Sequence, residues 1–450
     1  MFKRDILKKM SSWAEKKKRK PLILRGARQV GKTTAVNMFS ERFDQYLYLN
    51  LEIHEERRIF EQEYPVDELV RALFFYKDQK RENGKILIFI DEIQSCPSAV
   101  EYLRFFYEKC PDLYIIAAGS LLETLIDTHI SFPVGRVEYL VMKPLSFTEF
   151  LSASNKDETV KLIQETLPLP EFAHEKLMNL FHIYSIIGGM PEIVQNYIEN
   201  QDILALSTLF ESLIVSYLDD VEKYAKNKTM TNIIRHAVSN AFYDAGNRIK
   251  FQGFGNSNYK SREMGEALKT LEKTMYIYLL YPTSSVEFPL KPNFRKSPRL
   301  QTLDTGMLNY FAGFQKELFG AKNIDSVFQG KIAEHIVGQE LLACETSPLY
   351  KLNFWTREKK QSTAEIDFII KFNNLIIPVE VKSGPTGRLR SLHQFIDRSK
   401  HNFAIRVYSG KLQTDKLTTI NGKNFTLLNL PFYLTGSIYK YIEWFLATDR

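Results

Sequence analysis

The sequence predicts an α/β protein that begins with a parallel sheet covered by helices on both faces. Short, continuous apolar runs alternate with helical stretches from Pro21 onward, which is typical of buried parallel strands. After Pro144 the pattern becomes mostly helical, and two strand-like runs separated by two asparagines follow nearer the C-terminus. The length of 450 residues by itself favours about three domains.

The changes of pattern along the chain divide it into four segments. We expect residues 1–150 to form the core with the parallel sheet and residues 151–225 to form a helical lid. Residues 226–319 contain two or three helices followed by the β-rich run YIYLLYP, an order that favours a winged helix. Residues 320–450 start with a long helix and continue with strands, which predicts a further α/β domain.

Composition and charge restrict the class of protein. Apolar residues make up 44% and charged residues 25%, which argues against disorder and against a fibrous repeat. The net charge of +7 permits nucleic acid as a partner without requiring it, and the basic run at residues 16–20 is more typical of solvated surface than of a nucleic-acid patch. Three separated cysteines, no secretory signal and no apolar run near the ~18 residues of a membrane span predict a cytoplasmic protein with no membrane partner.

A phosphate-binding pattern follows the first apolar run. Residues 26–33 fit G-x-x-x-x-G-K-[ST], with a strand before them and a helix after them. The glycines let the backbone wrap a phosphate at the positive end of a helix, where Lys32 would reach the β- and γ-phosphates and Thr33 would hold Mg²⁺. We therefore predict ATP and Mg²⁺ as cofactors. The predicted binding residues are Gly26, Ala27, Arg28, Gln29, Val30, Gly31, Lys32, Thr33 and Thr34.

A second match lies in the run ILIFIDE at residues 86–92. An apolar strand that ends in a carboxylate places Asp91 at the carboxyl edge of the sheet, beside the phosphate loop. Asp91 would bind the Mg²⁺ shell through an ordered water, and Glu92 would polarise the attacking water as a general base. Loop, strand and spacing agree, so the sequence predicts nucleotide binding and hydrolysis.

Five segments together resemble a prokaryotic family of AAA-type P-loop ATPases: RGARQVGKTT, LIFIDEIQ, AAGSLLE, GRVEYLVMKPLSFTEF and GGMPEIV. Its members carry an uncharacterised C-terminal domain that is often likened to restriction-endonuclease folds. The resemblance implies that Ser120 lies at the sensor-1 position and that Arg136 is an arginine finger or sensor arginine. A structural salt bridge is an equal alternative for Arg136. Lys296, Arg299 and the turn at residues 304–306 resemble a family signature with no role that the sequence explains.

The segment expected to be a winged helix carries four basic residues on or near its second helix, namely Lys260, Arg262, Lys269 and Lys273. They could contact DNA phosphates, which makes DNA a candidate partner. The alternative, which we favour, is a module that packs against the ATPase core as a lid.

Two predicted strands near the C-terminus, residues 364–372 and 375–384, flank a two-residue turn. In that hairpin register Asp367 lies opposite Glu380 at a non-hydrogen-bonded pair, where side chains approach closely. Two opposed carboxylates repel each other unless a proton or a cation intervenes. A divalent metal with oxygen ligands, Mg²⁺ or Mn²⁺, is the natural resolution.

This segment also resembles the PD-(D/E)XK nucleases. Asp367 matches the first carboxylate of that motif, Glu380 and Lys382 match E-x-K, and Glu334 matches the helical glutamate that such enzymes often carry. The resemblance implies metal ligands at Glu334, Asp367 and Glu380, with Lys382 in a catalytic role. Ile366 stands where the motif name has proline, and a charged outer face of a surface hairpin is the structural alternative.

Two functions stay open on these grounds. The first is an ATP-hydrolysing protein that couples its nucleotide state to a DNA-directed, metal-dependent nuclease domain, which the four matching cluster residues favour. The second is a nucleotide-switched regulatory protein whose C-terminal domain binds DNA or protein without cleavage, which the modest net charge leaves open. The resembled family includes ring-forming relatives, but the sequence leaves a homo-oligomer undecided.

Overall fold

The computed structural model forms two compact units, which are described separately. One unit comprises Met1–Lys143 with Thr346–Tyr350, and the other comprises Pro144–Glu345 with Lys351–Arg450. The structure describes residues 2–119, 133–222, 225–313, 330–358, 364–384 and 389–448. None of the helices in these ranges has both the length and the apolar character that a membrane crossing requires.

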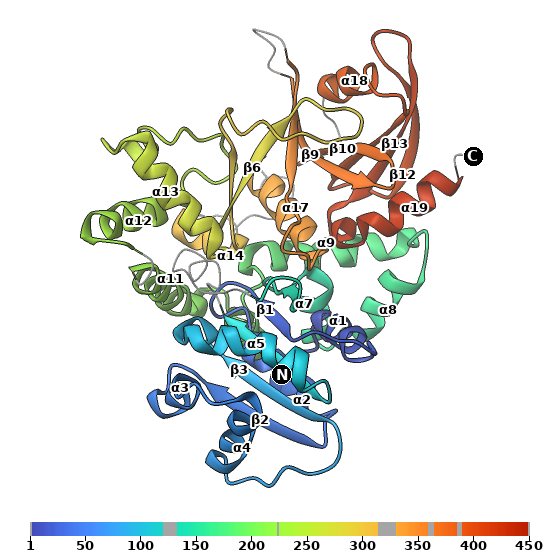
Figure 1. Ribbon diagram of the computed structural model, residues 1–450. Coiled ribbons are helices and arrows are strands. Elements are labelled where there is room, and N and C mark those ends of the chain that lie inside the picture. Colours follow the sequence, from blue (N-terminus) through green and yellow to red (C-terminus); the bar gives the residue numbers. More distant parts are fainter. Residues whose placement is uncertain are drawn as a thin grey trace. The chain divides into compact units, whose positions relative to one another are not determined.

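The first unit contains the predicted parallel sheet, of which Figure 1 labels β1, β2 and β3. The strand order is β2-β3-β4-β1-β5, and the pairing is parallel throughout. Its strands are β1 (Leu22–Arg25), β2 (Gln45–Asn50), β3 (Ile86–Asp91), β4 (Leu113–Gly119) and β5 (Glu138–Val141). The apolar runs of the sequence indicate the first four strands. The edge strand β5 is only four residues long and mostly half-buried, so no apolar run indicates it.

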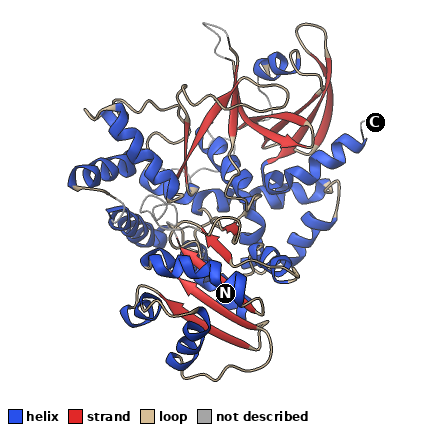
Figure 2. Ribbon diagram, in the orientation of Figure 1, coloured by secondary structure: helices blue, strands red, loops and turns tan. Residues whose placement is uncertain are grey.

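Helices cover this sheet, as Figure 2 shows. They are α1 (Ile6–Ala14), α2 (Lys32–Ser40), α3 (His54–Glu61), α4 (Val66–Tyr76), the short turn η1 (Ile93–Ser95) and α5 (Pro97–Lys109). The buried residues of α4 follow one helical face, from Val66 through Leu69 and Val70 to Leu73. They join the buried residues of the strands in one apolar core, while Pro97 at the first position of α5 suits the start of a helix.

The second unit begins with the helical region expected after Pro144. Ser146 and Glu149 form a capping box at the start of α7, and Gly188 ends α9 with a φ of +75°. The helices up to residue 273 are α7 (Phe147–Ala153), α8 (Asp157–Glu165), η2 (Glu171–Ala173), α9 (His174–Ile187), α10 (Pro191–Asn200), η3 (Leu204–Leu206), α11 (Ser207–Glu222), α12 (Lys228–Ala241), η4 (Phe254–Asn256) and α13 (Ser261–Lys273). The later helices are α14 (Thr305–Phe311), α17 (Lys331–Ala343), α18 (Arg390–Ile396), η5 (Phe432–Ser437) and α19 (Ile438–Thr448).

The second unit also contains an eight-stranded sheet with the order β12-β13-β11-β10-β9-β8-β6-β7. Its strands are β6 (Ile277–Thr283), β7 (Arg299–Thr302), β8 (Asn353–Thr356), β9 (Glu365–Phe372), β10 (Leu375–Lys382), β11 (Phe403–Tyr408), β12 (Gln413–Thr418) and β13 (Asn424–Pro431). β6 and β7 come from the segment expected to be a winged helix, yet β6 pairs in parallel with β8. The boundary expected near residue 320 therefore does not separate two sheets, because the buried β6 completes its hydrogen bonding with a C-terminal strand.

The hairpin of β9 and β10 has the predicted register. Phe372 pairs with Leu375 next to the turn, and Phe368 pairs with Val379 four residues further out. Asn373 in the turn has a φ of +49°, a conformation that asparagine adopts more readily than most residues. The same register, continued by one residue, places Asp367 beside Glu380.

Candidate functional site

The predicted phosphate loop connects β1 to α2 at the carboxyl edge of the first sheet. Gly31 precedes α2 with a φ of +95°, and a side chain at Gly26 would place its Cβ 2.6 Å from the carbonyl oxygen of Met142. Lys32 is buried, and its ammonium donates hydrogen bonds of 3.0 Å to the carbonyl oxygens of Gly26 and Ala27. The loop therefore folds around its own lysine. Among the other predicted binding residues, Ala27 and Val30 are buried, Arg28 is half-buried, and Gln29 and Thr34 are exposed.

The two residues predicted to hold Mg²⁺ lie in contact. The hydroxyl of Thr33 donates a 2.7 Å hydrogen bond to Oδ2 of Asp91, and the hydroxyl of Tyr48 on β2 lies 3.4 Å from the same oxygen. Burial raises the pKa of Asp91, although the hydrogen bond from Thr33 opposes that shift. A hydroxyl and a carboxylate are the oxygen ligands that Mg²⁺ prefers, so this pair fits the predicted cation.

Glu92 has an uncommon backbone conformation, with φ +50° and ψ +42°. Its side-chain oxygen Oε2 accepts a 2.5 Å hydrogen bond from Nε2 of Gln94. Gly119 at the end of β4 leaves room for that glutamine, because a Cβ at this position would collide with Oε1 of Gln94. Sequence reasoning missed Gln94, and only its place two residues after Glu92 could have indicated it.

Two further residues, Ser120 and Arg136, were predicted to belong to the nucleotide site. Ser120 lies outside the described residues. Arg136 donates a 2.6 Å hydrogen bond from Nε to Oε1 of Glu108, which also pairs with Arg104 at 3.1 Å. These contacts correspond to the structural salt bridge that the sequence left as an alternative for Arg136.

A further arginine supports the phosphate loop and was not predicted. Arg4 precedes α1 and is buried, and its guanidinium donates to the carbonyl oxygens of Val30 at 3.0 Å and Lys143 at 2.6 Å. An arginine so far before the loop has no local signal in the sequence, since its partners come close only in the folded unit.

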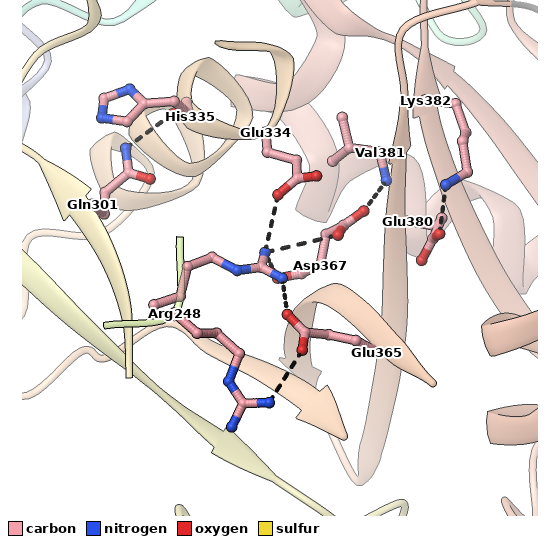
Figure 3. A network of polar contacts seen from close by, with 10 residues as sticks. Arg248, Gln301, Glu334, His335, Glu365, Asp367, Glu380, Val381 and Lys382 are labelled. Carbon is pink, nitrogen blue, oxygen red and sulfur yellow. Dashed lines mark hydrogen bonds and ion pairs between the residues drawn. The ribbon is translucent and has the colours of Figure 1, made fainter. Parts of the chain in front are cut away.

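The carboxylate cluster of the second unit brings together all four predicted residues (Figure 3). Glu334 comes from α17, Asp367 from β9, and Glu380 and Lys382 from β10. The ammonium of Lys382 donates to Oε1 of Glu380 at 2.7 Å, and the backbone N–H of Val381 donates to Oδ2 of Asp367 at 2.8 Å. The helix, the hairpin and the E-x-K residues therefore meet at one place.

Arg299 at the start of β7 lies among these carboxylates. Its Nη1 is 3.3 Å from Oε2 of Glu334 and 3.7 Å from Oδ1 of Asp367, and its Nη2 pairs with Glu365. Nη1 also donates a 3.2 Å hydrogen bond to the carbonyl oxygen of Asp367. Arg248 adds a second cation, with its Nη1 3.5 Å from Glu365 (Figure 3). The sequence marked Arg299 as part of a signature without explaining its role.

The electrostatics of the cluster reflect its burial. Burial, with repulsion from Asp367, raises the pKa of Glu334 to about 7 and the pKa of Glu380 to about 8. Burial also raises the pKa of Asp367, and Arg299 opposes that shift. These shifts favour the protonated forms of Glu334 and Glu380 near neutral pH.

Two carboxylate oxygens of the cluster could contact the predicted divalent cation. Oε2 of Glu380 is buried and has no hydrogen-bond partner in the described part of the chain, so it could serve as a ligand together with Oδ1 of Asp367. Glu334 instead faces Arg299. Within the described ranges, no group of three or more His, Cys, Asp or Glu side chains is arranged to hold a metal. Arg299 and Lys382 lie beside these carboxylates and offset part of their negative charge, and the metal ligands stay a prediction.

The structure also describes the other segments that the sequence singled out, namely GGMPE, the turn at residues 304–306 and the basic residues of α13. Asp304 is fully buried and accepts hydrogen bonds from the backbone N–H groups of Gly189 at 2.6 Å and Met307 at 3.0 Å. A side chain at Gly188 would collide with Asp304, so the GGMPE segment and the turn at residues 304–306 pack together. On or beside α13, Lys260, Arg262 and Lys269 are exposed and Lys273 is half-buried.

Comparisons with known proteins agree with the prediction for the first part of the chain. Residues 18–151 match the model of an AAA domain family, and residues 178–318 and 329–433 match two domains of unknown function, DUF8612 and DUF4143. An uncharacterized protein of Haemophilus influenzae is 22% identical over 373 residues, which cover 80% of this chain and 81% of that protein.

Two solved structures have a loose similarity to this chain. A Walker-type ATPase of Pyrococcus abyssi is 15% identical with a TM-score of 0.45, covering 69% of this chain and 96% of its own. The Orc1 protein of Aeropyrum pernix, solved in complex with DNA, is 13% identical with a TM-score of 0.30, covering 71% and 94%. Residues 18–151 therefore match an AAA domain, and the contacts of Lys32 and Thr33 within this range fit the phosphate loop that the sequence predicts.

Proposed function

We propose that this protein hydrolyses ATP at the phosphate loop and uses the nucleotide state to control a DNA-directed C-terminal domain. The observation that carries the first half is the 2.7 Å contact between Thr33 and Asp91. It links the end of the loop to the end of β3, and Glu92 directly follows Asp91, the group that would meet the cation.

The proposed reaction assigns each side chain one task. Lys32 and the backbone N–H groups at the start of α2 bind the phosphates, and Thr33 and Asp91 hold Mg²⁺. When bound, Mg²⁺ neutralises charge on the phosphate oxygens. Glu92 takes a proton from the attacking water, and its hydrogen bond with Gln94 keeps the carboxylate in place.

For the C-terminal domain, the proposal is a metal-dependent nuclease activity. The convergence of Asp367, Glu380 and Lys382 supports it, and so does the unpartnered Oε2 of Glu380 within the described ranges. The second candidate is a domain that binds DNA or protein without cleavage. The specific observation that favours this second candidate is Arg299, which lies 3.3 Å from Glu334 and 3.7 Å from Asp367.

A cleavage assay separates the two candidates. Linear, circular and branched DNA would be incubated with the full chain, with Mg²⁺ or Mn²⁺, and with or without ATP. Metal-dependent products that disappear in Lys382→Ala but persist in Lys371→Ala, an exposed lysine of β9, would support the nuclease. DNA binding without products from the parent would favour the second candidate.

A further inference from the structure

A pocket of about 510 Å³ lies in the first unit, away from the phosphate loop. Its lining includes Lys85, directly before β3, and Tyr114, the second residue of β4. Both positions are at the amino ends of parallel strands, whereas the phosphate loop follows the carboxyl end of β1 and Asp91 is the last residue of β3. The pocket is therefore at the opposite edge of the sheet, about 20 Å away for a strand of six residues.

The charge of the lining is strongly positive. Five cationic side chains line the pocket, and they are Lys16, Lys17, Arg19, Arg42 and Lys85. Glu15 is the carboxylate among the lining residues, and Glu138 pairs with Lys16 at 2.5 Å. Counting both acids leaves an excess of about three positive charges. A concave site with such an excess attracts anions.

Arg19 is held in a fixed position in this pocket. Its Nη2 donates to the carbonyl oxygens of Pro111 at 2.8 Å and Asp112 at 3.2 Å, and its guanidinium lies 3.4 Å from the ring centre of Tyr114. Its Nε is buried and has no hydrogen-bond partner among the residues that the structure describes. Arg19 therefore contributes to the lining a positive charge whose position these contacts fix.

The wall of the pocket is aromatic, but its rings contact one another. Phe43 lies edge-on to Tyr114 at 4.8 Å and to Phe39 at 5.4 Å between ring centres. Arg19 covers one face of Tyr114. The rings therefore form an apolar wall, beside which the attraction between the cations and an anion is stronger than in water. Because the rings contact one another, recognition depends on charge rather than on base stacking.

We propose that this pocket is a second phosphate-binding site, which takes the phosphate groups of a free polyphosphate or of a nucleic-acid backbone. The basic run at residues 16–20, expected to be solvated surface, supplies three of its five cations. Helix α2 begins at the phosphate loop with Lys32 and carries Phe39 in the pocket wall, so one helix connects the two sites. The proposal rests on this geometry alone and does not require ATP hydrolysis.

The test uses the full chain with Lys32→Ala, so that the phosphate loop does not contribute. Calorimetry would measure binding of pyrophosphate, and fluorescence anisotropy would measure binding of a labelled 20-nucleotide oligothymidylate at several salt concentrations. Adding Lys17→Glu and Lys85→Glu, both exposed, should weaken binding at least tenfold. For the oligonucleotide, the slope of log K against log salt should flatten by about 1.4, or 0.7 for each lost contact.

The matched control is Lys80→Glu with Lys109→Glu, which makes the same charge change at exposed residues outside the pocket lining. Binding of pyrophosphate alone would identify a free polyphosphate as the ligand, and salt-dependent binding of the oligonucleotide would identify a nucleic-acid backbone. If neither probe binds, or if the control pair weakens binding as much as the pocket pair, the proposal is wrong. Should the double reversal fail to fold, Lys17→Gln with Lys85→Gln repeats the test.

Discussion

Replacing Arg299 with methionine removes the guanidinium that lies among Glu334, Glu365 and Asp367 while keeping a side chain of similar length. The side chain of Arg299 is 8% exposed and that of Asp367 12%, so the pair is largely shielded from water. Removing one partner of a buried ion pair typically costs about 3–5 kcal/mol, because the other charge stays buried and uncompensated. We expect a loss of unfolding free energy of this size at pH 8.

The loss should shrink as the pH falls. Burial raises the pKa of Glu334 to about 7, so this carboxyl gains a proton as the pH falls through that value and then needs no cation. Arg299→Met should therefore cost less at pH 5.5 than at pH 8. At a hundred times its dissociation constant, Mn²⁺ should stabilise Arg299→Met by about 2.7 kcal/mol, and it should stabilise the parent less, because Arg299 already neutralises part of the cluster.

Urea unfolding at both pH values, with chelator or with Mn²⁺, measures these differences. Arg295→Met is the matched control, because Arg295 is exposed in the segment before β7 and its replacement should change stability by less than about 0.5 kcal/mol. If Arg299→Met unfolds at the urea concentration of the parent at pH 8, the guanidinium does not neutralise the cluster and this account of it is wrong.

Three further predictions concern buried and catalytic groups. Glu340 accepts hydrogen bonds from the hydroxyl of Tyr184 and a backbone N–H, and burial raises its pKa from 4.5 to about 7, so the parent loses stability as the pH rises between these values. In the Glu340→Gln chain, the loss of unfolding free energy between pH 4.5 and pH 8 should be smaller than in the parent by about 3 kcal/mol. Unfolding curves recorded across this pH range measure it. Gln94→Ala should slow phosphate release while ATP binding stays unchanged, because Glu92 loses the donor that positions it. Arg136→Ala should leave the rate of hydrolysis near that of the parent, because Arg136 pairs with Glu108.

Each of these three has a contradicting result. A Glu340→Gln chain with the same pH dependence as the parent would show that this carboxyl stays ionised. If Gln94→Ala weakens ATP binding as much as hydrolysis, the glutamine supports the whole site rather than Glu92. A hydrolysis rate for Arg136→Ala that is a thousandfold lower would restore the arginine-finger interpretation.

The parts of the fold that local sequence determines could be predicted. The hairpin register follows from a two-residue turn between alternating runs, and both lie within 20 residues. The phosphate loop follows from a strand, a glycine pattern and a helix in direct succession. The contact of Thr33 with Asp91 follows as well, because parallel strands end at one edge of the sheet.

The remaining parts depend on contacts between distant residues. Arg299 contacts Glu365 and Asp367, which come 66 and 68 residues later, and the three residues meet only in the folded unit, where β7 and β9 belong to one sheet. The sequence pattern shows that Asp367 and Glu380 are opposed, but it does not show that β7 brings Arg299 to them. The pattern alone therefore predicts a metal as the neutralising cation. Arg4 at the phosphate loop is missed for the same reason.

The measurement that tests the central claim most directly is ATP binding and phosphate release by the Glu92→Gln chain beside the parent and Lys32→Ala. Glutamine fills the space of Glu92 and cannot take a proton, so we expect ATP affinity near that of the parent with hydrolysis slower by about 10²–10⁴-fold. Lys32→Ala should lose tight ATP binding, because the ammonium that we expect to contact the phosphates is gone. If Glu92→Gln hydrolyses ATP at the rate of the parent, Glu92 is not the base and the proposed reaction is wrong.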